Sequence, residues 1–220
     1  MALSKLTYDS LNVTAAASKA VGFGSGADDL SASLSGGSMV FIKKLTASSS
    51  ATLSFVDGTS DVVLDSTYKE YMFTFKNIHP EEVEKEFGVQ FNAAGGSGYN
   101  ETITSSVIKA RHTEGDTAAE VVYNSSADQA QGTGFQTLSE DSGNANDNCV
   151  SGFLHLYDPS NTTFVKHFMS TIAEVGGGDS QLKNNFIAGY INTTSAIDEV
   201  QFKFSSGDID AGDICLYGIS

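Results

Sequence analysis

The stretch 199-EVQFKFSSGDIDAGDICLYGI-219 decides the fold class. Phe202 and Phe204 alternate with polar residues, and Ile214 and Leu216 repeat the alternation after a gap. A period of two residues is typical of a β-strand with one buried face. The segment between the two runs is rich in glycine, serine and aspartate, which favour turns. We therefore expect a β-hairpin that forms the last two strands of an all-β fold.

The same segment carries three aspartates, Asp208, Asp210 and Asp213, which raise the hypothesis of a calcium site. A calcium loop of the EF-hand type supplies oxygen ligands at alternate positions and ends in a bidentate glutamate. This segment lacks that glutamate and is too short to surround an ion alone. An acidic turn is the interpretation that we favour, with calcium binding as the alternative.

Similar alternation extends through residues 38–220 and predicts nine or ten short strands. In 68-YKEYMFTFKNI-78, the residues Tyr71, Phe73 and Phe75 share one face. The stretch 149-CVSGFLHLYDPSNTTFVKHFMSTI-172 has two apolar runs joined by a turn-forming segment, the pattern of a hairpin. Strands at this spacing, without a long helix, are typical of an antiparallel β-sandwich, and we expect a jelly-roll-like arrangement.

Residues 1–37 have a different composition, dominated by alanine, serine and glycine. Such a segment has little apolar surface to bury and many flexible positions. We predict a flexible N-terminal arm preceding a single sandwich domain of residues 38–220. The alternative is a frayed terminus without a role.

Composition excludes some partners. The 220 residues carry a formal net charge of −15, and 18% of them are charged. Nucleic acid and anionic membranes are bound through clustered lysine and arginine, so neither is an expected partner. We expect neither a signal peptide nor a membrane-spanning segment, because no basic n-region leads into a continuous apolar segment and no apolar run is long enough. Cys149 and Cys215 are therefore expected to be reduced thiols in a protein made in a cytoplasm.

Catalytic and metal sites find little support in the sequence. The segment 95-GGSGY-99 departs from the Gly-x-Ser-x-Gly nucleophile motif, and 22-GFGSG-26 precedes no strand-to-helix turn. A four-residue turn in the hairpin of residues 149–172 would place His155 and His167 on opposite faces, which argues against a shared zinc ion. We predict a protein that is not an enzyme and needs no cofactor.

Glycan binding is a second class of function to consider. Sugars pack on aromatic side chains, and Tyr99, Tyr123 and Tyr157 lie near expected loops. Tyrosines at strand ends also bridge core and solvent without any ligand. These three residues are the candidate glycan contacts.

The last expected strand, 215-CLYGI-219, is apolar on both faces. Leu216 faces the core with Ile214, which leaves Cys215, Tyr217 and Ile219 on the other face. A strand that is apolar on both faces is expected to be covered on both. It is therefore either central in the sandwich or in contact with another subunit.

Three stretches together resemble a group of small structural proteins of tailed, mainly marine, bacteriophages. They are 66-STYKEYMFTFKNIHP-80, 150-VSGFLHLYDPSNTTFVKHF-168 and 195-SAIDEVQFKFSSGDIDAGDICLYGI-219, and the closing pattern is the most specific part. The resemblance implies a virion component with a β-sandwich or jelly-roll body, in which the three closing aspartates occupy variable polar turn positions. The charged segment 81-EEVEKE-86 departs from the short polar turn that the group has there, and we expect a charged loop or a single helical turn.

The resemblance leads to the functional expectation. We expect a capsid decoration (cement) protein on the phage head surface, made in the host cytoplasm, that binds itself as a homotrimer and binds the major capsid protein or other virion proteins. The alternative is a tail- or fibre-associated adhesin that binds host surface glycans. The residues expected at subunit or capsid interfaces are Leu6, Tyr8, Leu11, Val13, Val21, Phe23, Cys215, Tyr217 and Ile219.

Overall fold

The computed structural model describes residues 22–23, 30–31, 38–178 and 180–220. The chain divides into two compact units, residues 1–38 and 39–220. In the first unit, β1 (Gly22–Phe23) pairs with β2 (Leu30–Ser31) in antiparallel fashion. The flexible arm expected over residues 1–37 otherwise lies outside the described residues.

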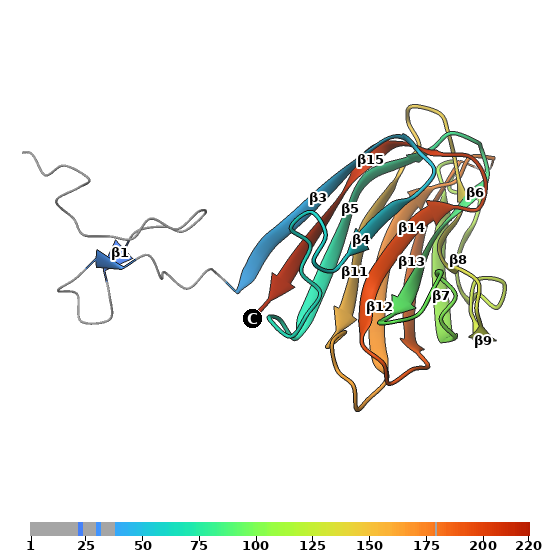
Figure 1. The fold of residues 1–220 in the computed structure, drawn as a ribbon. Coiled ribbons are helices and arrows are strands. Elements are labelled where there is room, and N and C mark those ends of the chain that lie inside the picture. The colour runs from blue at the N-terminus through green and yellow to red at the C-terminus, as the bar shows by residue number, and fades with distance from the viewer. Residues whose placement is uncertain (1–21, 24–29, 32–37, 179) are drawn as a thin grey trace, which may run out of the picture. The chain divides into compact units, whose positions relative to one another are not determined.

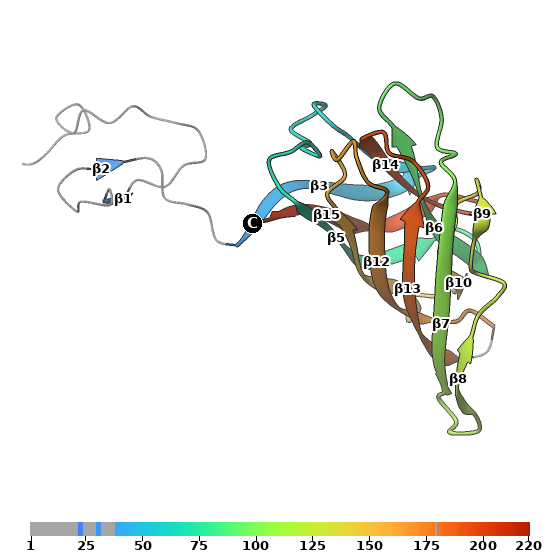
Figure 2. The same ribbon diagram turned by 90° about the horizontal axis from the view of Figure 1, so that it is seen from below.

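The second unit consists of two antiparallel sheets packed face to face (Figure 1). The prediction of an antiparallel β-sandwich is therefore confirmed. The large sheet has the strand order β3-β15-β5-β11-β12-β13-β7-β8, with β9 beside β7, and the small sheet has the order β10-β6-β14-β4. Figure 2 shows the large sheet from below, with its strands side by side from β3 to β8.

The strands of the large sheet are β3 (Met39–Ser50), β5 (Glu70–Pro80), β7 (Ile103–Thr113), β8 (Ala119–Tyr123), β9 (Ala130–Gly132), β11 (Val150–Tyr157), β12 (Lys166–Val175), β13 (Gln181–Ile191) and β15 (Ile209–Ile219). The strands of the small sheet are β4 (Leu53–Val56), β6 (Lys85–Ala93), β10 (Gln136–Ser142) and β14 (Ile197–Phe204).

Aromatic side chains from both sheets form the centre of the core. The ring of Phe202 on β14 lies 5.4 Å from that of Phe73 and 5.2 Å from that of Phe75, both on β5, between ring centroids. Phe87 on β6 lies 5.5 Å from Phe75. All four side chains are buried, as the alternation of the sequence predicts. Aromatic pairs at these separations add to the stabilisation that burial provides.

The expected hairpin between the last two strands is wrong. β14 pairs with β6 and β4 in the small sheet, whereas β15 pairs with β3 and β5 in the large sheet. Residues 205–208 carry the chain from one sheet to the other, so Asp210 and Asp213 lie within β15 rather than in a turn. Alternation shows that one face of each strand is buried, but it does not show which sheet holds the strand.

The hairpin of β11 and β12 is present, but its expected register is wrong. His155 pairs with Met169, and the connection over residues 158–165 is longer than the expected four-residue turn. In this loop the side-chain oxygen of Asn161 accepts hydrogen bonds from the backbone N–H groups of Thr163 and Phe164, at 2.7 and 2.9 Å. Because His167 stands two residues before Met169, His155 and His167 lie on the same face rather than on opposite faces.

The charged segment of residues 81–86 forms no helical turn. Residues 81–84 are bends, and β6 begins at Lys85. The segment is therefore a charged loop that leads directly into the small sheet.

Candidate functional site: the open face of the large sheet

The small sheet packs against one face of the large sheet, and we call the opposite face the open face. Its side chains form three cross-strand rows. The first row contains Met39, Ile219, Glu70, Tyr157, His167, Tyr190 and Thr104. The middle row contains Phe41, Tyr217, Met72, His155, Met169, Ala188 and Ser106. The third row contains Lys44, Cys215, Thr74, Phe153, Thr171, Phe186, Ile108 and Tyr123.

Large apolar side chains on this face are exposed. Phe41 on β3 has 57% of its surface exposed, Met169 on β12 has 52%, and Phe186 on β13 has 46%. Isolated exposed apolar residues are ordinary, whereas a contiguous apolar patch marks an interaction surface. The open face is therefore the candidate functional site.

Two adjoining depressions lie on the part of the open face formed by β7, β11, β12 and β13. Their volumes are about 520 and 390 Å³. Both are lined by Ser106, Tyr157, Met169 and Ala188. The small side chains of Ser106 and Ala188 leave space that the larger residues around them enclose. The walls of both depressions are mainly apolar, which suits an apolar side chain better than a charged ligand.

The rows contain a single carboxylate, Glu70, and it contacts the imidazole of His155 on the neighbouring strand. Burial raises the pKa of the Tyr157 hydroxyl above its ordinary value, and the nearby Glu70 carboxylate raises it further. This tyrosine is therefore neutral at physiological pH. A protein with a net charge of −15 thus presents three rows with one carboxylate, Glu70, and one lysine, Lys44, and the ion pairs of Asp213 with Lys44 and Lys76 lie beside them.

Cys215, Tyr217 and Ile219 lie on the open face, as their pattern predicts. β15 is flanked by β3 and β5, so it is central in the sheet, and its Leu216 is buried against the small sheet. No other layer of the described chain covers the opposite face, where Tyr217 and Ile219 are half-buried. A central position and an uncovered second face thus occur together in this strand.

The three candidate glycan contacts do not lie together. Tyr157 lines both depressions, and Tyr123 lies at the β8 end of the third row, where its hydroxyl contacts Asp128. The hydroxyl of Tyr99 instead donates a hydrogen bond to Glu199 on β14, at 2.7 Å, which ties Tyr99 to the small sheet.

The other expected interface residues cannot be placed on this face. Leu6, Tyr8, Leu11, Val13 and Val21 lie outside the described residues. Phe23 belongs to β1, and its side chain is also outside the description.

Most of the open face was missed from the sequence. The signal was present in 153-FLHLY-157 and 186-FIAGY-190. In each stretch the first and last residues are aromatic, and both stand at positions that alternate with the core positions and so face away from the core. Only the closing strand was interpreted in this way. The three rows exist because these strands are neighbours in one sheet, which a single sequence does not reveal.

The three closing aspartates have separate partners. Asp213 accepts a hydrogen bond from Thr46 at 2.6 Å and lies 3.4 Å from the Lys44 ammonium, which together lower the pKa of its carboxyl. Asp210 lies 3.7 Å from Nδ1 of His79, and the backbone N–H of Asp208 donates to Glu81. Among the described residues, no cluster of three or more His, Cys, Asp or Glu side chains could hold a metal ion.

A further depression of about 340 Å³ is lined by His79, Cys149 and Asp210, which are residue types of nucleophilic catalysis. The His79 Nε2 lies 3.2 Å from the carbonyl oxygen of Ala145, and the Cys149 sulfur lies 4.0 Å from the side-chain oxygen of Asn77. The imidazole and the thiol thus have different partners.

Comparison with known proteins returned no matching family model, no matching curated protein and no matching solved structure. Within the part of the chain that the structure describes, no helix has the length and apolar character needed to cross a membrane.

Proposed function

We propose that this protein is a non-enzymatic structural protein of a tailed bacteriophage virion, a capsid decoration protein on the head surface. The observation that carries the proposal is the open face, which exposes large apolar side chains and has a single carboxylate in its three rows, on an acidic sandwich. Such a surface is typical of proteins that are buried in assemblies. The virion context comes from the resemblance of the three stretches described above.

The proposed mechanism is energetic rather than chemical. A protein that binds only the mature shell stabilises that shell by mass action. The major capsid protein and further copies of this chain are the proposed partners; the homotrimer expected from the resemblance is one arrangement of these copies, and a two-fold pair is the other. In this proposal the open face and residues 1–37 provide the contacts.

Quantitative mass spectrometry of purified virions tests the proposal. We expect a copy number comparable to that of the major capsid protein. A copy number far below it would move the protein to the tail, and absence from the virion would overturn the structural role. Deletion of residues 2–30 tests the N-terminal contact region separately from the open face. We expect this deletion to abolish capsid binding while the sandwich stays folded.

Glycan binding by a tail or fibre adhesin is a second candidate, favoured by the position of Tyr157. Its ring lines both depressions, and the first of them is also lined by His167 and Tyr190. Aromatic rings at a depression are the usual platform for a sugar ring. We expect Tyr157→Ala to abolish saturable binding of host polysaccharide by the isolated protein. Tyr99→Ala is the matched control, because Tyr99 contacts Glu199 on the small sheet.

A further inference from the structure

We propose that a second copy of this chain occupies the open face, stacked face to face about a two-fold axis that passes through His155. The inference rests on the proposed role of the open face as an assembly surface; it names the partner and replaces the homotrimer by a two-fold pair. Three properties of the rows support it: their distribution of side-chain size, their charge and their area.

Side-chain size is distributed unevenly along the middle row. One end carries Phe41 and Tyr217, whose rings lie 5.7 Å apart, and Phe41 has more than half of its surface exposed. The other end carries Ala188 and Ser106, which line the depressions. His155 is the central member of the seven. A two-fold axis at His155, parallel to the strands, therefore places Phe41 opposite Ser106 of the second copy and Tyr217 opposite its Ala188.

The same operation places a carboxylate opposite an imidazole in the first row. Glu70, the single carboxylate of the rows, comes to lie opposite His167 of the second copy. No carboxylate faces another carboxylate across the axis, although each chain carries 27 acidic residues. Two acidic molecules can therefore meet on this face without bringing carboxylates of the three rows into contact.

The area of the face suits a specific contact. Seven neighbouring strands at about 4.8 Å spacing and three rows about 7 Å apart cover roughly 30 by 20 Å, or about 600 Å² on each copy. Two copies then bury about 1,200 Å², at the lower bound of the range for specific protein interfaces. Sheets that stack in this way align their strands within about 30°, so the central contacts persist despite the twist.

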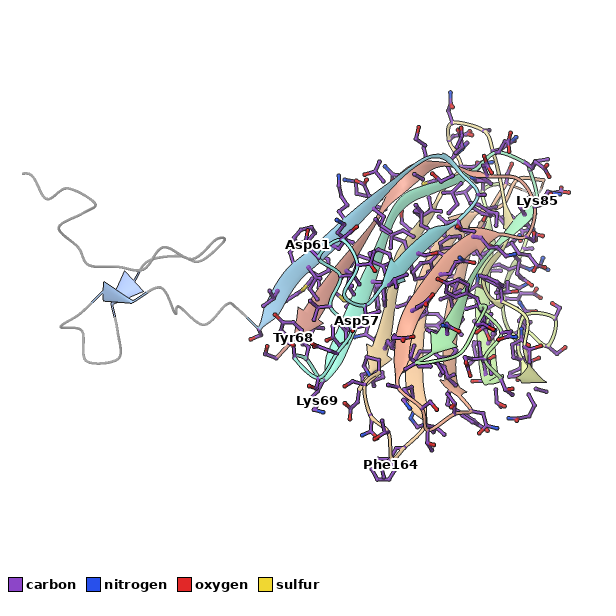
Figure 3. All side chains as sticks on the ribbon, viewed as in Figure 1. Asp57, Asp61, Tyr68, Lys69, Lys85 and Phe164 are labelled. Atoms are coloured by element: carbon purple, nitrogen blue, oxygen red, sulfur yellow. The ribbon has the colours of Figure 1, made fainter. Side chains whose placement is uncertain are left out.

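The mass of the purified full-length protein tests the inference. By sedimentation equilibrium we expect a dimer of the 23.1 kDa chain. Phe41→Asp introduces a charge where the second copy packs, and we expect the dissociation constant to rise at least ~30-fold. Phe164→Asp is the matched control, because Phe164 is 68% exposed in the loop between β11 and β12 (Figure 3) and belongs to none of the three rows.

Exchanging a large and a small side chain between the two facing positions distinguishes this specific pairing from a non-specific apolar contact. Phe41→Ala removes the large side chain, and Ser106→Phe fills the depression, so we expect each single variant to weaken the dimer. The double variant exchanges the two sizes across the axis and is expected to recover most of the loss. If the loss of dimer affinity in the double variant equals the sum of the losses in the two single variants, the proposed register is contradicted.

Other outcomes overturn the pairing without touching the proposed function. A monomer at every concentration leaves the open face to the capsid protein or to a glycan. A trimer whose mass is unchanged by Phe41→Asp uses a different surface, because a face that pairs with itself produces two-fold contacts. The virion copy number decides the structural role independently of either result.

Discussion

Glu174 on β12 and Lys183 on β13 lie directly opposite each other and are both buried between the two sheets. The Glu174 carboxylate accepts a hydrogen bond from the backbone N–H of Glu140 at 3.0 Å, and the Lys183 ammonium lies 2.7 Å from Asp141. Burial raises the pKa of Glu174 to about 7, although the positive charge of Lys183 opposes the rise. A carboxyl and an ammonium group thus lie side by side in the interior, where other polar side chains such as Asn185 and Ser139 are also buried.

This pair predicts a stability that falls as pH rises from about 4.5 to about 7. The folded protein holds the Glu174 proton more tightly than the unfolded chain does, so ionisation costs folding free energy across this window. The full cost is up to about 3 kcal/mol. We expect Glu174→Gln to raise the free energy of unfolding at pH 8 and to reduce its pH dependence in urea titrations between pH 5 and 8. Glu114→Gln, at an exposed position, is the control and should leave the pH profile unchanged.

Gly212 on β15 predicts a strong effect of a single methyl group. Its φ is +121°, and a Cβ there would lie 2.6 Å from the carbonyl oxygen of Asn77 on β5. We expect Gly212→Ala to lower the free energy of unfolding by about 2 kcal/mol or more, measured by chemical denaturation. Gly115→Ala is the control, since its nearest contact would be at 3.8 Å and it should change stability by less than about 0.5 kcal/mol. Equal stability of the two variants would contradict the close approach of β15 to β5.

Lys166 is fully buried, and its ammonium donates hydrogen bonds to the carbonyl oxygens of Thr193 and Ser195. Burial lowers the pKa of this ammonium, and the carboxylates of Asp158 and Glu101 oppose the change. We expect Lys166→Ala to destabilise the fold by about 3 kcal/mol, because it removes a packed side chain and leaves two carbonyl groups without their donor.

The control for Lys166 is Lys69→Ala. Lys69 forms an exposed ion pair with Asp158 at 2.9 Å, and such pairs contribute less than about 1 kcal/mol. Thermal unfolding of the two variants should therefore differ clearly, and a small effect at Lys166 would show that the carbonyl groups find other donors.

Tyr71 is buried on β5, and its hydroxyl donates a hydrogen bond to the carbonyl oxygen of Asp65 at 2.9 Å. Burial raises the pKa of this hydroxyl above its ordinary value. We expect Tyr71→Phe to cost about 1 kcal/mol in chemical denaturation, the usual contribution of one such hydrogen bond. In Tyr157→Phe the lost partner is only the sulfur of Met169, at 3.9 Å, so stability should stay unchanged. Equal losses in the two variants would show that the Asp65 contact adds nothing.

Local alternation predicted the core faces correctly. Phe73, Phe202 and Leu216 are all buried, as their period of two requires. The strand partners did not follow from alternation, since β14 and β15 have similar patterns and belong to different sheets. Turn length also misled the register of β11 and β12, because the side chain of Asn161 stabilises a longer loop.

The candidate site was predicted only at one end. Tyr217 was identified from a strand that is apolar on both faces, whereas Phe41 and Met169 were not, although the same sheet aligns them in one row. The buried Glu174 and Lys183 could not be expected either, because charged residues at core positions depend on a partner from another strand. Long-range pairing is what the sequence alone leaves undetermined.

The position of β3 has a consequence for biosynthesis. Among the described strands, β3 pairs with β15 alone, so the first strand of the large sheet is attached through its last. While the chain is being synthesised, residues 39–50 must wait until residues 209–219 have left the ribosome before they gain a hydrogen-bonded neighbour. Until then β5 also lacks one of its two neighbours in the sheet. Closure of this sandwich is therefore a late event, and a nascent chain that stalls before Ile209 presents an unpaired sheet edge to chaperones or to other nascent chains.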